Sequence, residues 1–352
     1  MGSSSRAPPT YTIRRGVEGS ETKWLQHQAS RRRGNLCWIW DPAWTPAKAS
    51  SPLDLSEDTW LTLTVMTSLE DHVQLKILSV AVFSFGEVAK ATASGSKVTC
   101  CDISSDGKLL ATGGHDKKAV LWSAEHLQPK SSLEEHSMLI TDVRFSPSMP
   151  RILATSSFDR TLRVWDADDT EYSLRTFTGH QAPIMSLDFH PNKQDVICSC
   201  DSDGQVHSWR ANYANCLTCV KVSRGVAVQL RFQPLKGKYL ATASEKAVFI
   251  LDGETQMASR SPLQGHSKTI QSVCWDSSGD YLASVSEDSV RIWSFTSGHD
   301  GEFVHELNSR GKMFHSCVFH PTCPSLLVIG CYKASLSLSL SLSLSLSLSL
   351  WL

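Results

Sequence analysis

The feature that most constrains this chain is a short phrase that recurs about every 42 residues and closes on tryptophan. Trp122, Trp165, Trp209 and Trp293 end the stretches HDKKAVLW, FDRTLRVW, SDGQVHSW and SEDSVRIW. Their separations are 43 and 44 residues, and then 84, which is two periods. The absent member is EKAVFILD, where Leu251 takes the place of the tryptophan. A fixed period of this length predicts a series of like supersecondary units.

Within each unit the apolar residues alternate as they do in half-buried strands. A run such as ITDVRFSP or IMSLDFHP is followed by a polar turn, then by a run such as ILATSSFD, and then by the tryptophan strand. A variable strand, such as residues 173–177, completes the unit. Four short strands per unit predict an all-β fold, and specifically the blades of a β-propeller.

Three polar marks recur in register with the tryptophans. A histidine at 136, 180 and 266 precedes an aspartate by 23, 23 and 22 residues, and a hydroxyl residue stands four positions before each aspartate. An aspartate at the head of a half-buried strand is tolerated only when it is hydrogen-bonded. The Gly-His pairs, the turn aspartates and the strand-end tryptophans resemble those of WD40 repeats.

This resemblance implies hydrogen-bonded tetrads of histidine, hydroxyl, aspartate and tryptophan. The expected tetrads are His136–Thr155–Asp159–Trp165, His180–Ser199–Asp203–Trp209 and His266–Ser284–Asp288–Trp293. The same residue types also suit a catalytic triad. Three copies at one period instead favour a structural role, because a nucleophile needs a single pocket with an oxyanion hole. We therefore expect no catalytic residues.

The repeats do not fill the whole chain. The first unit, from Lys97 to Trp122, lacks the histidine, and the fourth has Glu245 in place of the aspartate. A sixth unit begins near Val304 and runs into eight Ser-Leu pairs between Ser335 and Leu350. We expect three regions: 1–76, unassigned and either disordered or non-authentic; 77–333, an incomplete propeller; and 334–352, a low-complexity tail. Five or six blades are recognisable where the family has seven. We therefore expect an incomplete propeller, and the sequence leaves open whether its ring closes.

The two ends have simple interpretations. A CT dinucleotide repeat is translated as alternating leucine and serine in every frame, which favours a retained intron or faulty gene model for the tail. Basic residues at 14–15 and 31–33 are compatible with nuclear localisation, but a solvated charge run is the favoured interpretation.

The amino-acid sequence of the repeats points to a particular family more specifically than their period does. The stretches SKVTCCDISSDGKLLATGGHDKKAVLW, LEEHSMLITDVRFSPSMPRILATSSFDRTLRVWDAD and QSVCWDSSGDYLASVSEDSVRIW resemble the plant LEUNIG and LEUNIG-homolog transcriptional co-repressors. The resemblance covers about 83 to 333, including the degraded fourth unit. It implies a non-catalytic nuclear scaffold with a role in plant development. In that family, DNA-bound transcription factors recruit the scaffold, which brings in histone deacetylases and Mediator components and does not bind DNA directly.

Partners of propellers usually meet the face formed by the loops after Gly-His and by the turns that carry the aspartate. The residues expected to bind partners are Ser137, Met138, Phe158, Arg160, Gln181, Pro183, Lys268 and Thr269. Phe158 and Arg160 are the sharpest candidates, because aromatic residues and arginine are enriched at binding hot spots. An alternative function is a generic WD40 adaptor, such as a substrate receptor of a ubiquitin ligase. The basic residue expected after the Trp165-Asp166 pair of such a receptor is absent.

Composition argues against several other classes of function. The 34 basic and 35 acidic residues nearly cancel, which argues against a basic nucleic-acid binder. The longest apolar run, residues 77–85, is too short to span a bilayer, and an odd count of 11 cysteines favours free thiols. Cys216 and Cys219 have zinc-ligand spacing, but no matching second pair lies nearby, and Cys198 and Cys200 share one strand face. We expect no metal, cofactor, membrane contact or small-molecule substrate.

Overall fold

The computed structural model describes residues 11–14, 24–29, 37–40, 92–213, 215–309, 313–320, 326–331 and 336–338. All regular secondary structure of these residues is β-strand, apart from turns and bends, and every strand pairing is antiparallel. No helix that could cross a membrane occurs in these ranges. The expectation of an all-β fold is confirmed.

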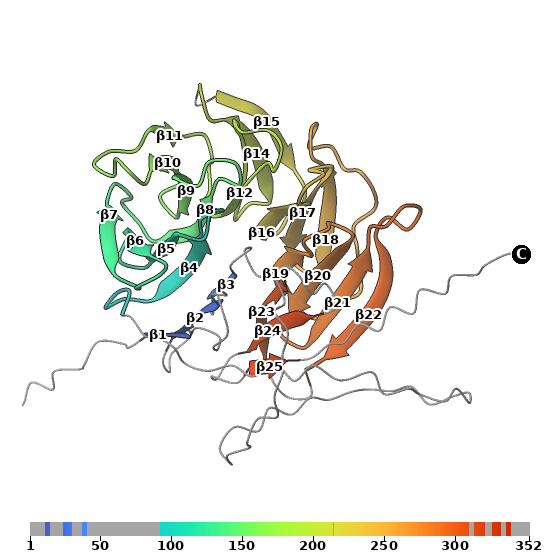
Figure 1. The fold of residues 1–352 in the computed structure, drawn as a ribbon. Coiled ribbons are helices and arrows are strands. Elements are labelled where there is room, and N and C mark those ends of the chain that lie inside the picture. The colour runs from blue at the N-terminus through green and yellow to red at the C-terminus, as the bar shows by residue number, and fades with distance from the viewer. Residues whose placement is uncertain are drawn as a thin grey trace, which may run out of the picture.

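The six repeat units form six sheets, which we call repeat sheets 1 to 6 (Figure 1). Repeat sheet 1 contains β4 (Val98–Ile103), β5 (Leu109–Gly114), β6 (Ala119–Ser123) and β7 (Pro129–Leu133). Repeat sheet 2 contains β8 (Ile140–Phe145), β9 (Ile152–Ser157), β10 (Leu162–Asp166) and β11 (Arg175–Phe177). Repeat sheet 3 contains β12 (Ile184–Phe189), β13 (Val196–Asp201), β14 (Gln205–Arg210) and β15 (Asn215–Lys221).

The later sheets follow the same order. Repeat sheet 4 contains β16 (Ala227–Phe232), β17 (Tyr239–Ser244) and β18 (Ala247–Asp252). Repeat sheet 5 contains β19 (Ile270–Trp275), β20 (Tyr281–Ser286), β21 (Ser289–Ser294) and β22 (Glu302–Asn308). Repeat sheet 6 contains β23 (Phe314–Phe319), β24 (Leu327–Cys331) and β25 (Leu336–Leu338), so part of the Ser-Leu tail supplies its third strand.

A further sheet comes from a segment that carries no repeat. It contains β1 (Tyr11–Arg14), β2 (Trp24–Ala29) and β3 (Cys37–Trp40). Strand β3 contacts both β4 and β23, so this sheet lies between repeat sheets 1 and 6 (Figure 1). The described residues thus form seven sheets, one more than the repeats predict, and their inner strands contact one another around a ring. A propeller usually closes when a strand N-terminal to its first repeat completes the last blade, and residues 77–88, which precede the first repeat here, lie outside the described residues.

The inner strand of every repeat sheet has the same irregularity. Each shifts register at its second residue, as between Ile140 and Asp142 in β8 or between Ile270 and Ser272 in β19. A bulge of this kind adds one residue to one strand and bends it. The alternation of apolar residues does not predict this register shift, which recurs in all six repeat sheets.

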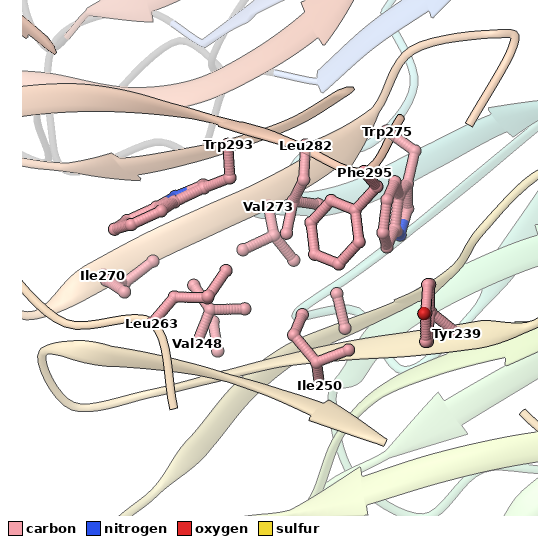
Figure 2. Close-up of a cluster of buried hydrophobic side chains, with 12 residues drawn as sticks. Tyr239, Val248, Ile250, Leu263, Ile270, Val273, Trp275, Leu282, Trp293 and Phe295 are labelled. Carbon is pink, nitrogen blue, oxygen red and sulfur yellow. The ribbon is translucent and has the colours of Figure 1, made fainter. Parts of the chain in front are cut away.

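The core consists of apolar layers between neighbouring sheets. Figure 2 shows one layer, in which Val248 and Ile250 of repeat sheet 4 face Val273 and Leu282 of repeat sheet 5. Burying one such side chain stabilises the fold by about 1.5–3 kcal/mol. Because every layer needs both of its sheets, each unit is stable only with its neighbours, which is the physical basis of the repeat architecture.

Candidate protein-interaction face and the side chains behind it

Repeat sheet 2 contains a hydrogen-bonded chain of four side chains. The Trp165 indole donates from Nε1 to Thr155 Oγ1 at 2.9 Å. His136 lies with Nε2 2.7 Å from the same oxygen and with Nδ1 2.8 Å from Asp159 Oδ2. Since the aspartate accepts, Nδ1 carries the proton and Nε2 accepts from the threonine. The structure thus links His136, Thr155, Asp159 and Trp165 in the expected order.

Asp159 holds the turn that follows β9 to the loop that precedes β8. Its carboxylate accepts from the backbone N–H of Ser137 at 3.0 Å and of Thr161 at 2.9 Å. Burial would raise the pKa of Asp159, but the hydrogen bonds from His136 and Thr161 outweigh it and hold that pKa well below its usual range. The charge therefore positions two loops on one face of the ring.

In repeat sheet 3 the expected carboxylate is wrong. His180 Nδ1 lies 2.7 Å from Asp201 Oδ2, whereas the side chain of Asp203 is exposed and only its N–H takes part, donating to Asp201 Oδ1 at 3.0 Å. Asp201 is the last residue of β13 and lies within direct reach of the imidazole. In repeat sheet 2 this position is Ser157, whose hydroxyl donates to Met138 O, so the turn aspartate is needed there. Ser199 and Trp209 occupy their expected places.

In repeat sheet 5 the expected contact from His266 to Asp288 is indirect. His266 Nδ1 lies 2.9 Å from Ser286 Oγ, and that hydroxyl donates to Asp288 Oδ1 at 2.8 Å. Ser284 still joins His266, at 2.7 Å, to the Trp293 indole, at 2.9 Å. The shorter spacing in this unit brings the strand-end serine, rather than the turn aspartate, under the ring.

The remaining described sheets keep only fragments of this chain. In repeat sheet 1, Trp122 donates to Thr112 Oγ1 at 3.0 Å, and no histidine joins them. In repeat sheet 4 the equivalent hydroxyl, Thr242 Oγ1, is buried and has no hydrogen-bond partner, because Leu251 replaces the indole. The degraded unit foreseen from the sequence is thus a sheet with an unsatisfied hydroxyl.

Burial also argues against a catalytic use of these groups. Thr155 and Ser199 are both 0% exposed, so no substrate carbonyl could approach their hydroxyls. The tetrads instead rigidify the loops beside them.

Those loops carry the residues expected to bind partners. Six of the eight are exposed, namely Ser137, Met138, Arg160, Gln181, Lys268 and Thr269, and two are half-buried, namely Phe158 and Pro183. Arg160 donates to the backbone oxygen of Gln181 at 3.3 Å, which links the turn of repeat sheet 2 to the loop of repeat sheet 3. Arg160 also has a φ of 68°, a left-handed conformation that costs a non-glycine residue about 1–2 kcal/mol. Lys268 and Thr269 lie on the equivalent loop of repeat sheet 5.

Sequence reasoning missed a cluster behind the loop of repeat sheet 3. The His207 ring lies against that of His180, with centroids 3.8 Å apart and planes tilted by 34°, and burial, with a smaller effect of the neighbouring His180, lowers the pKa of His207 to about 4. Ligand atoms of His180, Asp201 and His207 lie within 4.8 Å of one another, which is compatible with a metal ion. Both nitrogens of His180 are already engaged, by Asp201 and Ser199, so hydrogen bonding within repeat sheet 3 accounts for the cluster.

The cysteines lie in three settings. Cys198 and Cys200 are fully buried in the core, as their shared strand face predicts. Cys216 and Cys219 are exposed on β15, and a register shift in that strand brings both onto His207, with Cys219 Sγ 3.2 Å from Nε2 and Cys216 Sγ 3.7 Å from Nδ1. The two thiols meet opposite edges of one ring and so do not converge on one ion. Eight of the described cysteines form no disulfide, whereas Cys101 is disulfide-bonded, contrary to the expectation of free thiols throughout.

A second cluster, also missed, lines the inner strands of repeat sheets 1 to 4. Arg231 Nη1 lies 3.0 Å from Asp142 Oδ2 and 2.9 Å from Ser186 Oγ, and so joins three sheets. Arg144 Nη1 donates to Asp102 at 3.4 Å. Burial would raise the pKa of Asp142, but Arg231 and Arg144 outweigh it and lower that pKa. The charges hold the inner strands together across the ring.

Comparison with known proteins agrees with this geometry. The profile of the WD domain, G-beta repeat family (WD40) matches residues 85–123, 127–166, 171–210 and 258–294. These ranges contain repeat sheets 1 and 2 and three of the four strands of repeat sheets 3 and 5, and they leave out β16–β18, where the tetrad is missing.

Several curated proteins are similar to this chain. Transcriptional corepressor LEUNIG_HOMOLOG of Arabidopsis thaliana is 51% identical over 252 residues, which is 72% of this chain and 31% of the relative. Pre-mRNA-processing factor 19 homolog 2 of the same plant is 29% identical over 54% of this chain and 37% of the relative. Nuclear distribution protein PAC1 of Arthroderma benhamiae is 32% identical over 47% of this chain and 38% of the relative. The chain thus spans about a third of the length of these relatives.

Proposed function

This chain is a WD40-repeat β-propeller protein, and from that premise we propose that it acts as a non-catalytic scaffold in transcriptional co-repression. The observation that carries the proposal is the 51% identity to a transcriptional co-repressor over 252 residues, since the other relatives reach about 30%.

The working surface in this proposal is the face of the loops held by the tetrads. Its polar and charged members, Arg160, Gln181 and Lys268, come from three different sheets, so the surface spans the ring. Met138 adds an apolar side chain that is 47% exposed. A mixed surface with a few long side chains suits a protein partner, because methionine and arginine are enriched where proteins meet.

The partners in this proposal are proteins already assembled on DNA. Transcription factors recruit the scaffold, which recruits repressive machinery such as histone deacetylases and Mediator components in the nucleus. Direct contact with DNA is not part of the proposal, because the formal net charge of −1 gives no excess of basic residues to neutralise phosphates.

A tethering assay tests the proposal. The chain is fused to a heterologous DNA-binding domain and expressed in plant protoplasts with a reporter that carries the matching sites. We expect several-fold repression that a histone deacetylase inhibitor relieves. The variant M138A/R160A/K268A should lose most of the repression. The control L235A/M257A alters two side chains that are 67% and 62% exposed on the opposite face and should repress normally.

Two results would count against the proposal. A tethered chain that is present in the nucleus but leaves the reporter unchanged would contradict a co-repressor role. An unchanged reporter, together with loss of the proteins that bind the chain and rescue of those proteins by a proteasome inhibitor, would instead favour the ubiquitin-ligase adaptor.

A further inference from the structure

Two thiols from neighbouring repeat sheets lie almost in contact. The Sγ atoms of Cys274 and Cys317 are 3.0 Å apart. Cys274 lies on β19 and Cys317 on β23, the inner strands of repeat sheets 5 and 6. The corresponding pair at the previous sheet boundary is Arg231 and Val273, which cannot form a covalent bond. The register that packs one inner strand against the next therefore brings two cysteines together at this boundary.

The two thiols differ in their access to solvent. Cys317 is 7% exposed and lies among the apolar side chains between repeat sheets 5 and 6, whereas Cys274 is half-buried at the edge of that layer. Burial raises the pKa of Cys317 well above its usual range, so it remains a protonated thiol. Cys274 is thus the thiol that a small oxidant meets first, and Cys317 is placed to react second.

We propose that Cys274 and Cys317 form a reversible disulfide between repeat sheets 5 and 6 when a peroxide oxidises the protein. The Cys274 thiolate attacks one oxygen of hydrogen peroxide and breaks the O–O bond, so that Cys274 becomes a sulfenic acid. The hydroxide that leaves takes up a proton and becomes water. The Cys317 sulfur then attacks the sulfenic sulfur, loses its proton and expels the hydroxyl as a second water. One peroxide is reduced, two thiols are oxidised and one S–S bond forms.

The geometry favours this second step over further oxidation. A disulfide bond is about 2.05 Å long, so the sulfurs need to approach by only about 1 Å from their present separation. A dithiol reductant reverses the reaction by exchange through a mixed disulfide. The reduced and oxidised forms then differ in one covalent link between strands 43 residues apart.

That link would act on the last repeat sheet. Repeat sheet 6 has three strands in the described part of the chain and packs against repeat sheet 5 through β19 and β23. A bond between those strands removes disorder from the unfolded chain and so stabilises the folded ring. Oxidation is therefore expected to stabilise the folded protein rather than to inactivate it.

Peptide mapping of the whole chain tests the proposal. Reduced protein is treated with stoichiometric hydrogen peroxide, its free thiols are blocked, and tryptic peptides are sequenced by mass spectrometry. The expected product joins peptide 269–291 to peptide 313–333. The second peptide also contains Cys323 and Cys331, so fragment ions must assign the link to Cys317. The background variant C216S/C219S removes the exposed thiol pair that would otherwise consume oxidant.

Thermal unfolding supplies a second readout. In the C216S/C219S background, oxidation should raise Tm by several degrees, and a dithiol reductant should reverse the shift. C274S should show a smaller shift, limited to what the disulfide of Cys101 contributes in both variants, and because Cys274 is half-buried this variant is expected to fold. The proposal is overturned if Cys274 and Cys317 both remain open to alkylation at peroxide concentrations that oxidise Cys216 and Cys219 in the unmodified chain.

Discussion

Thr155 of repeat sheet 2 and Thr242 of repeat sheet 4 occupy the same place in their units but have different neighbours. Both side chains are 0% exposed. Thr155 Oγ1 meets the Trp165 indole at 2.9 Å and the His136 imidazole at 2.7 Å, whereas Thr242 Oγ1 has no partner. In repeat sheet 2 the buried hydroxyl is the centre of a hydrogen-bond network. In repeat sheet 4 the same hydroxyl is buried without a partner and lowers the stability of the fold.

The comparison separates what builds a sheet from what positions its loops. Repeat sheet 4 keeps its three strands in register and its apolar layer against repeat sheet 5, although it lacks both the histidine and the tryptophan (Figure 2). Burial of apolar side chains is therefore sufficient for the strands. The tetrad is needed where a loop must be held, as Asp159 holds the N–H of Ser137.

The largest expected effect comes from converting repeat sheet 2 into the pattern of repeat sheet 4. Trp165 is 0% exposed, so Trp165→Leu leaves a cavity and removes the indole N–H from Thr155. We expect the free energy of unfolding to fall by about 3 kcal/mol. Urea denaturation followed by circular dichroism measures it, and a loss below about 1 kcal/mol would contradict the role given to the indole.

The next effect distinguishes two aspartates of repeat sheet 3. Asp201→Asn places an amide donor against the N–H of His180 and should cost about 2 kcal/mol. Asp203→Asn changes an exposed side chain and should remain within about 0.5 kcal/mol of the unchanged protein. The two variants are compared by the same denaturation. Equal losses, or a greater loss for Asp203→Asn, would restore the assignment expected from the sequence.

A smaller effect appears only at acid pH. Because the pKa of Asp159 is lower in the folded than in the unfolded chain, its stabilising contribution is complete above the unfolded value of about 3.9 and is lost as pH falls below it. Asp159→Asn should therefore lose stability at neutral pH and show a shallower decline between about pH 5 and pH 3 than the unchanged chain. Melting temperatures across this range measure the difference, and parallel declines would count against it.

The smallest expected effect is an increase in stability. Thr242→Val replaces the unpartnered hydroxyl with a methyl group of similar size and should raise the free energy of unfolding by up to about 1 kcal/mol. Thr112→Val is a useful control, since that hydroxyl accepts from Trp122 and its removal should be destabilising. A clear loss of stability in Thr242→Val would mean that the hydroxyl has a partner in solution.

Much of the fold could be predicted from the sequence, because a period of 42 to 44 residues constrains every unit at once. The repeat sheets and the degradation of repeat sheet 4 follow from it, and the resemblance to WD40 repeats implies the tetrad of repeat sheet 2. Asp201 did not, because the letters CDSD offer two carboxylates and only backbone geometry selects the one under His180. Backbone geometry also makes the contact of Asp288 indirect, since Ser286 lies between Asp288 and the His266 imidazole. The sheet formed by β1–β3 has no repeat to mark it.

The contacts between units were the hardest to foresee. Arg231 reaches Asp142 over 89 residues of sequence, and neither residue is part of the repeated marks. Cys274 and Cys317 had a visible signal, because they stand 43 residues apart on equivalent strands. A search for chemically matched residues one period apart would have found that pair.

The most direct test of this account is to make one substitution in both sheets. Thr155→Val and Thr242→Val remove the same hydroxyl from equivalent strands, and urea denaturation gives the change in the free energy of unfolding for each. The account predicts a loss of about 2 kcal/mol for Thr155→Val, because His136 and Trp165 are left without their shared oxygen, and no loss for Thr242→Val. Equal changes in the two variants would contradict the claim that the tetrad, and not burial alone, distinguishes these sheets.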